Sequence, residues 1–352
     1  IDTIRSQVGT LAWVHTFGPT LVNEFRFSVN RVASLASDPT DKTSPASLGF
    51  TNINPDDPAG VAPPIIYFNS FNIGPSPQGP TTSADMVYRW ADSVTWTRGR
   101  HEWKFGGDFS HVRDNFNYDY FNNGSFDFTY GDFTGNELAD FIGGFWDNYY
   151  QFSNAVYGIR TNSYSLFGQD TWKVTQRLTL DLGLRYEYYS PQSDNHNNLL
   201  GNFPGQQSTV FPDSPPGILY PGDPGTPNKA LMYPDRNNFA PRLGFAWDMF
   251  GNAKLVMRGG FGIFYDLQDG ATNLQFGGEP PFGGVANMYP FSFSGVSGDT
   301  MADPFLTYFG DSSANPFPFA SRGLVGTFLD PKIPYAYLTD PHFRTRSEEH
   351  TS

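Results

Sequence analysis

The chain has 352 residues, a net charge of −13 and no cysteine. With only 22 Lys and Arg residues it has few cations to neutralise phosphates, which argues against a nucleic-acid-binding protein. The lack of cysteine excludes disulfides, thiolate zinc sites and cysteine nucleophiles. Aromatic residues reach 17% and charged residues only 16%, against about 25% charged residues in a typical soluble domain.

Eight stretches alternate between apolar and polar residues with a period of two, which is typical of β-strands. In the clearest one, every second residue from Leu178 to Tyr188 is Leu or Tyr. At about 3.3 Å per residue this strand is about 36 Å long, the length of a tilted membrane-spanning strand of about 9–11 residues. Ordinary strands have about 5–6 residues. We expect the eight strands near residues 8–17, 20–33, 85–97, 102–117, 155–172, 177–189, 239–249 and 254–266.

The connections between these strands alternate between short and long. The short ones are at residues 18–19, 98–101, 173–176 and 250–253, and the long ones are at 35–84, 118–154, 190–238 and from 267 onward. Connections this long without predicted strands are unusual inside a compact soluble domain. They are typical of outer-membrane barrels, which have short periplasmic turns and long extracellular loops. Within the second long connection, residues 136–145 predict a short helix that ends at two glycines.

These patterns predict an all-β fold: a partial transmembrane antiparallel β-barrel of about eight long strands, with short periplasmic turns and long extracellular loops. A soluble β-sandwich also has alternating strands, but it requires neither spans this long nor this asymmetry of the loops. No stretch is long and apolar enough for a transmembrane helix.

Six segments of the chain resemble the TonB-dependent outer-membrane receptors, in particular the Oar-like subgroup that is frequent in Acidobacteria. The segments are LAWVHTFGPTLVNEFR (11–26), HEWKFGGDF (101–109), SLFGQDTWKVT (165–175), LGLRYE (182–187), NNFAPRLGFAW (237–247) and RGGFGIFYD (258–266). Their order and spacing cover most of the chain. The resemblance implies a barrel of about 22 strands filled by an N-terminal plug. It also implies a TonB box that couples uptake to the proton gradient through the TonB complex.

The chain departs from this plan, because it contains no plug-like segment, no TonB box and only about eight of the strands. We therefore expect residues 1–345 to be a partial receptor barrel, an internal fragment. Residues 346–352 look like the translation of a sequencing adapter, and we expect them not to be native.

No residues form a recognisable catalytic, cofactor-binding or metal-binding motif. The acidic residues, among them Asp56, Asp57, Asp108, Asp114 and Asp119, have no fixed separation and predict solvated loops rather than a glycosidase pair. The histidines show no metal-binding spacing. The glycines at 259, 260 and 262 open no helix and predict bending or close approach of strands rather than a dinucleotide site.

Aromatic and basic residues suggest where the chain contacts lipid, loops and lumen. Tyr186, Tyr188, Tyr189 and Trp172 end strands, where interfacial girdles form. We expect the loop aromatics to pack within the loops, with stacking on sugars as the alternative. These loop residues are Tyr67, Phe68, Phe71, Phe145, Trp146, Tyr149 and Tyr150. Arg185 and Arg258 lie on polar strand faces and are expected to line the lumen.

The sequence thus predicts a non-enzymatic fragment of an energised transporter in the outer membrane of a Gram-negative bacterium. Its expected partners are outer-membrane lipid, the TonB complex and an unidentified siderophore, glycan or peptide, with no cofactor, no nucleic acid and no assigned ligand-binding residues. The alternatives are a secreted or surface-attached β-rich protein for carbohydrate binding or adhesion and, less favoured, an acidic glycoside hydrolase.

Overall fold

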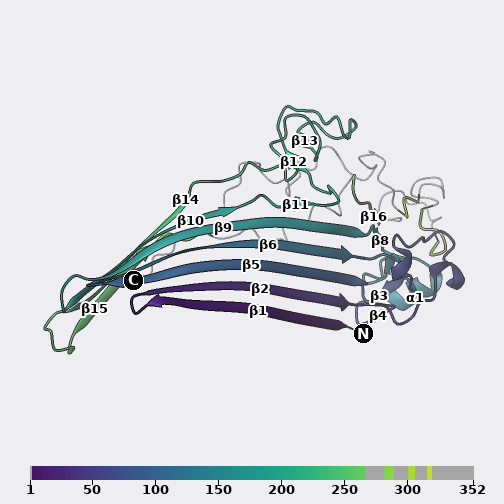
Figure 1. Cartoon of the computed structure of the whole chain (residues 1–352). Coiled ribbons are helices and arrows are strands. Elements are labelled where there is room, and N and C mark those ends of the chain that lie inside the picture. Colours follow the sequence, from purple (N-terminus) through teal and green to yellow (C-terminus); the bar gives the residue numbers. More distant parts are fainter. Residues whose placement is uncertain (1, 266–280, 289–299, 306–314, 319–352) are drawn as a thin grey trace.

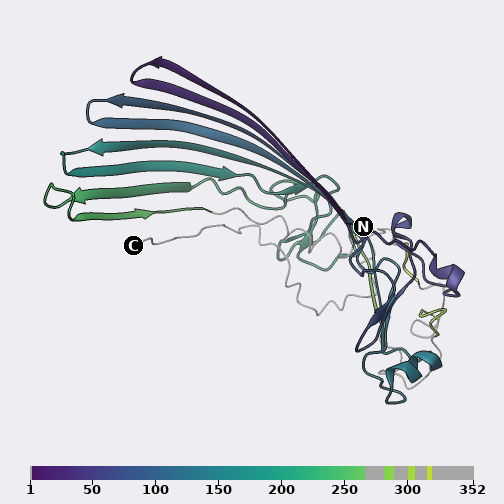
Figure 2. The same cartoon turned by 90° about the horizontal axis from the view of Figure 1, so that it is seen from below.

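The computed structural model describes residues 2–265, 281–288, 300–305 and 315–318. Its main feature is an antiparallel sheet of eight long strands in the order β1-β2-β5-β6-β9-β10-β14-β15, with the short β11 (Ser193–Asp194) paired to β9 (Figure 1). The long strands are β1 (Thr3–Gly18), β2 (Leu21–Ala36), β5 (Thr81–Arg98), β6 (His101–Tyr118), β9 (Ala155–Lys173), β10 (Leu178–Tyr189), β14 (Asn238–Asp248) and β15 (Val256–Gly262). In the view from below, the strands fan out with β1 and β15 at opposite edges (Figure 2).

All eight predicted strands are present, and the antiparallel barrel sheet is confirmed. Consecutive long strands pair with one another, so each of the four predicted tight turns joins neighbours in the sheet. The turn between β5 and β6 needs a left-handed residue, and Gly99 provides it with a φ of 63°. The largest difference in the bounds is at β1, which begins at Thr3; β5 also begins earlier than predicted, at Thr81, and β15 ends earlier, at Gly262.

The two faces of the sheet differ in chemistry. Residues directly opposite each other in antiparallel strands point to the same face. From β5 to β14, the exposed large hydrophobic side chains share one face, which we call the outer face. They are Trp90, Phe105, Tyr164, Leu166, Leu182, Leu184, Phe239, Leu243 and Trp247. Apolar side chains exposed along every strand are what a lipid-facing surface requires. The opposite, polar face is called the inner face below.

Aromatic residues on the outer face form two groups at different levels along the strands, an upper row nearer the long connections and a lower pair nearer the short turns. The upper row runs across six strands in register: Leu11, Phe27, Trp90, Phe109, Tyr164 and Tyr188. Its neighbouring rings lie 4.8–6.1 Å apart. Near the short turns, Trp96 and Trp103 lie 4.8 Å apart. The two groups are about 20 Å apart along β5, close to the height of an apolar band between two girdles.

The predicted girdle residues Tyr186, Tyr188 and Trp172 share the outer face, but the expectation for Tyr189 is wrong. Tyr189 pairs with Ser163 and, two residues after Glu187, points to the inner face like Glu187. Strand alternation places consecutive tyrosines on opposite faces, so Tyr188 and Tyr189 cannot both belong to a girdle.

The long connections at the other end of the sheet fold into a cap. A five-stranded sheet in the order β16-β8-β7-β3-β4 combines pieces of three connections (Figure 1). Its strands are β3 (Ile65–Tyr67), β4 (Asn72–Ile73), β7 (Ser125–Asp127), β8 (Asn148–Phe152) and β16 (Val285–Met288). The short helices η1 (Pro45–Leu48) and η2 (Pro58–Gly60) lie in the first connection, and β12 (Gly201–Asn202) pairs with β13 (Ile218–Leu219) in the third.

The predicted helix is α1 (Glu137–Gly143). Asn136 caps its start by accepting bonds from two backbone N–H groups, and Gly144 ends it with a φ of 75°.

The cap has its own hydrophobic core. Phe126, Phe128, Trp146 and Tyr149 are fully buried in it, together with Phe305. Phe68 is also buried, while Phe71 is exposed and stacks on Phe68 at 4.5 Å. The expectation that loop aromatics pack within the loops is therefore confirmed for Phe68, Trp146 and Tyr149. The connection from residue 267 onward and residues 346–352 lie largely or wholly outside the described residues.

Candidate functional site

An ion-pair network lies on the inner face of the sheet. Arg185 Nη2 on β10 lies 3.1 Å from Asp108 Oδ2 on β6, and Arg185 Nε donates to Glu187 Oε1 at 2.5 Å. Arg89 Nη2 on β5 lies 3.4 Å from Asp108 Oδ1, and Ser165 donates its hydroxyl proton to Asp108. The network therefore joins four strands.

Strand periodicity puts these groups on one side of the wall. Asp108 is directly opposite Ser165, and Ser165 is directly opposite Glu187, so all three point inward. The side chains of Asp108 and Glu187 are 13% and 10% exposed, and that of Arg185 is 24% exposed. Carboxylates this well covered are stable only when paired, and the two arginines supply the charge.

Phe167 forms an apolar surface beside this network. It lies opposite Gly106 on one side and opposite Arg185 on the other. A Cβ on Gly106 would lie 2.8 Å from Phe167 Cζ, so the ring occupies space that the glycine leaves. The Arg185 Cζ atom is 6.0 Å from the ring centroid, within cation–π range.

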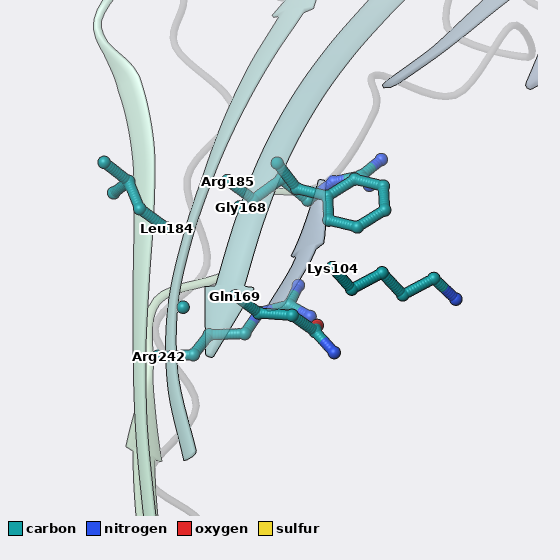
Figure 3. Close-up of a pocket in the computed structure, with 8 residues that line it drawn as sticks. Lys104, Gly168, Gln169, Leu184, Arg185 and Arg242 are labelled. Atoms are coloured by element: carbon teal, nitrogen blue, oxygen red, sulfur yellow. The ribbon is translucent and has the colours of Figure 1, made fainter. Parts of the chain in front are cut away.

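Two shallow hollows flank Phe167. The first, of about 230 Å³, has Lys104, Gln169 and Arg242 in its lining along with Arg185. Figure 3 shows the Lys104, Gln169 and Arg242 side chains on one side of the strands and Leu184 on the other. Gly183 lies opposite both Gln169 and Arg242, so no side chain fills the floor between them. The second hollow, of about 180 Å³, is lined by Glu24, Arg26, Arg89 and Asp108 among others.

The arrangement can bind charged groups, and the two hollows differ in sign. The first is lined by three cations and no carboxylate, so it suits an anion. The second mixes both signs, and in it Arg26 Nε donates to Glu24 Oε1 at 2.6 Å. Both hollows are open to the inner side, which fits contact with another surface better than enclosure of a small molecule.

A buried carboxyl lies where β6 enters the cap. Asp119 is fully buried, and neither of its oxygens has a hydrogen-bond partner among the residues that the structure describes. Burial, followed by repulsion from Asp57 and Asp56, raises the pKa of Asp119 to about 8. This carboxyl is therefore neutral at neutral pH. Within the described residues, no group of three or more His, Cys, Asp or Glu side chains is placed to hold a metal ion.

The structure separates the residues that the sequence singled out. Arg185 points inward as expected and is a member of the network. Arg258 lies opposite Ala246, which gives it inner-face parity too, but it is exposed at the β15 edge, away from Asp108. Asp108 has a definite partner in the sheet, whereas Asp56, Asp57 and Asp119 gather at the cap. The sequence analysis did not identify Lys104, Phe167, Gln169 or Arg242 as lining of the inner face. The alternation of residues along the strands would have placed them on the same face as Asp108 and Arg185.

Comparisons with known proteins place this geometry in a family. Residues 1–347 match the family described as outer membrane beta barrel domain. The chain belongs to the outer membrane beta barrel domain family. The outer face with its apolar band thus contacts the lipid of the outer membrane, and the inner face lines the barrel. No helix in the described ranges is long and apolar enough to cross a membrane.

Two solved structures show some similarity to this chain. The siderophore receptor PiuA from Acinetobacter baumannii has 10% sequence identity and a TM-score of 0.37; the alignment covers 75% of this chain and 33% of that one. The FpvAI–pyocin S2 complex has 11% identity and a TM-score of 0.25, with coverages of 76% and 35%. This chain thus spans about a third of the length of the chains in these structures. No curated protein sequence matches it.

Proposed function

We propose that this chain is the barrel segment, residues 1–345, of a TonB-dependent transporter of the Oar-like type. The transporter takes up a ligand across the outer membrane with energy from the proton gradient. The proposal is supported by the family match, by the six segments that resemble Oar-like receptors, and by the alternation of short turns with a folded cap. In the same proposal, residues 346–352 are not native to the protein.

The observation that carries the proposal furthest is the charged inner face. Eight strands that filled a narrow closed barrel would meet side chain to side chain in its interior. Here β1 and β15 lie at opposite edges of an open fan, and the inner face presents ion pairs and open hollows (Figure 2). A wall of this kind suits a wide lumen whose charged groups contact a plug or a passing ligand.

The roles divide between the two ends of the wall. The cap is on the long-loop side, which faces the medium, and captures the ligand there. The plug, in this proposal, contacts the network around Asp108 and couples to the TonB complex in the periplasm. The proposal includes no catalytic step. The ligand class, whether siderophore, glycan or peptide, is left to the uptake experiment.

The test is energised uptake by cells that produce the full-length protein in a host without competing receptors. Labelled ferric siderophores, oligosaccharides and oligopeptides serve as probes. We expect uptake of one probe class, and we expect it to cease when TonB is deleted or when a protonophore collapses the proton gradient. Uptake that continues without TonB would show a passive channel. Absence of uptake for every class, with the protein folded in the outer membrane, would contradict a transport function.

A further inference from the structure

The outer face carries a row of arginines above the upper aromatic row. Arg31 on β2, Arg113 on β6 and Arg160 on β9 lie at one height. Arg31 is in register with Arg113 through Met86 of β5, and Arg113 is directly opposite Arg160. On each strand the arginine is four positions further toward the cap than the ring of the upper aromatic row, or about 13 Å along the strand. We call these three residues the arginine row.

The arginine row has no acidic counterpart on its face. The outer-face positions of β1, β2, β5, β6 and β9 between the aromatic row and the strand ends hold four arginines, with Arg5 as the fourth, and no Asp or Glu. This contrasts with the net charge of −13. At the same height the acidic residues Asp85 and Asp114 lie opposite each other with inner-face parity. At this height the outer face therefore carries positive charge and the inner face carries negative charge.

Arg113 and Arg160 are directly opposite each other across β6 and β9. Like charges in this position destabilise an antiparallel pair. Arg160 donates to Asn115 Oδ1 at 2.7 Å and to backbone carbonyls, which are neutral acceptors. Asp194 and Asp114 attract it electrostatically, but neither forms an ion pair with it among the described residues. Arg113 is exposed and has no ion pair among the described residues. An anion between the two guanidinium groups would remove this repulsion and use their free donors.

The location identifies the source of that anion. The arginine row faces the bilayer, and aromatic rings below it mark the level where the apolar band ends. Arginine side chains beyond that level extend into the headgroup region. A soluble anion reaches the inner face or the cap more readily than this lipid-covered surface. A phosphomonoester is the fitting group, because its double charge and three oxygens can bridge two guanidinium groups.

We propose that the arginine row binds the phosphate of a phosphomonoester lipid in the outer leaflet, with Arg113 and Arg160 as the bridging pair and Arg31 two strands away in the same row. The site is independent of the transported ligand, since it is on the opposite face of the wall from the lumen. It requires only the membrane position that follows from the family.

The test measures lipid binding by the full-length protein in nanodiscs of phosphatidylcholine with or without phosphatidic acid as the probe. Native mass spectrometry counts the phosphatidic acid that the protein retains after release from the disc. We expect Arg113→Gln/Arg160→Gln to retain about tenfold less phosphatidic acid than the unmodified protein, the ratio expected from loss of a charge-assisted contact. We expect Arg113→Lys, which keeps the charge, to retain most of it.

The matched control is Arg98→Gln/Lys254→Gln, which removes two cations near the short turns. We expect this control to retain phosphatidic acid like the unmodified protein. Equal retention by the arginine-row variant would overturn the proposal. Complete displacement of the lipid by inorganic phosphate at equal concentration would also overturn it, because the site would then belong to a soluble anion. Heat-modifiable migration on gels verifies that each variant is folded. If the double variant does not fold, the single variant Arg113→Gln tests the site, because it is expected to retain less phosphatidic acid than Arg113→Lys.

Discussion

Arg185 on β10 reaches across β9 to Asp108 on β6, with 3.1 Å between Arg185 Nη2 and Asp108 Oδ2. The two strands are not neighbours in the sheet, so no backbone hydrogen bond joins them. The side chains thus connect strands that the ladder leaves separate. Between them, Ser165 donates to Asp108, and Phe167 lies against Gly106, where there is no Cβ.

Replacing Asp108 with Asn is predicted to destabilise the barrel wall. The substitution leaves Arg89 and Arg185 without one of their carboxylate partners on a mostly covered surface. We expect a loss of about 1–3 kcal/mol in the free energy of unfolding, below the value for a fully buried pair. The temperature at which the folded form disappears on gels measures the effect.

The matched control for Asp108→Asn is Arg26→Met. The Arg26 side chain is 62% exposed and pairs with Glu24 on the same inner face. We expect a change of less than about 1 kcal/mol, as for exposed ion pairs in general. If the two variants lose equal stability, the network around Asp108 has no special role.

Replacing Tyr149 with Phe is predicted to loosen the cap and leave the barrel wall intact. The Tyr149 hydroxyl donates to Gln151 Oε1 at 2.7 Å in a fully buried position. The Gln151 amide in turn donates to the carbonyls of Asn54 and Asn122, which are in two different connections. Losing the hydroxyl leaves a buried acceptor unpaired, at a cost of about 1–3 kcal/mol.

The rate of protease digestion on intact cells measures how far the cap is loosened. We expect the Tyr149→Phe variant to be cut in the cap faster than the unmodified protein, while its gel migration stays that of a folded barrel. Tyr130→Phe is the control, because Tyr130 is 73% exposed. Faster digestion of the control than of Tyr149→Phe would contradict the role of the buried hydroxyl.

The stability of the cap is predicted to fall as the pH rises. Asp119 has a pKa of about 8 in the folded protein, raised by burial and by Asp57 and Asp56, against about 3.9 in an unfolded chain. Between these values the folded state binds the extra proton, so stability decreases from about pH 4 to about pH 8 and then levels off. We expect Asp119→Asn to flatten this dependence.

Protease digestion of the cap at a series of pH values measures the slope, with Asp213→Asn as an exposed control in the third long connection. The control is expected to keep the slope of the unmodified protein. Cap stability that increases with pH across this window would show that Asp119 is ionised in the folded protein.

The long strands could be predicted from the sequence because their signal is local. The alternation from Leu178 to Tyr188 depends only on which residues face lipid, and this stretch is strand β10 with its predicted bounds nearly unchanged. The tight turns were predicted for the same reason. The helix at Asn136 was also readable, because its cap residue and final glycines are adjacent to it in the sequence.

The cap sheet and the inner-face network could not be predicted in this way. β3 and β7 have three residues each and pair in parallel across two different connections, so their signal is mainly tertiary. The alternation of side chains along the strands suggested that Asp108 and Arg185 point inward. Their contact, however, depends on the register of β6, β9 and β10, which no local pattern specifies.

The central claim is that the sheet crosses the outer membrane with the cap outside and the short turns in the periplasm. The chain contains no cysteine, so single substitutions provide unique labelling sites. Ile142→Cys places a thiol in the cap at a position that is 84% exposed, and Arg100→Cys places one in the turn between β5 and β6. A membrane-impermeant maleimide is applied to intact cells and to cells with a permeabilised outer membrane. We predict labelling of Ile142→Cys in both preparations and of Arg100→Cys only after permeabilisation. Labelling of Arg100→Cys on intact cells, or protection of Ile142→Cys there, would contradict the account.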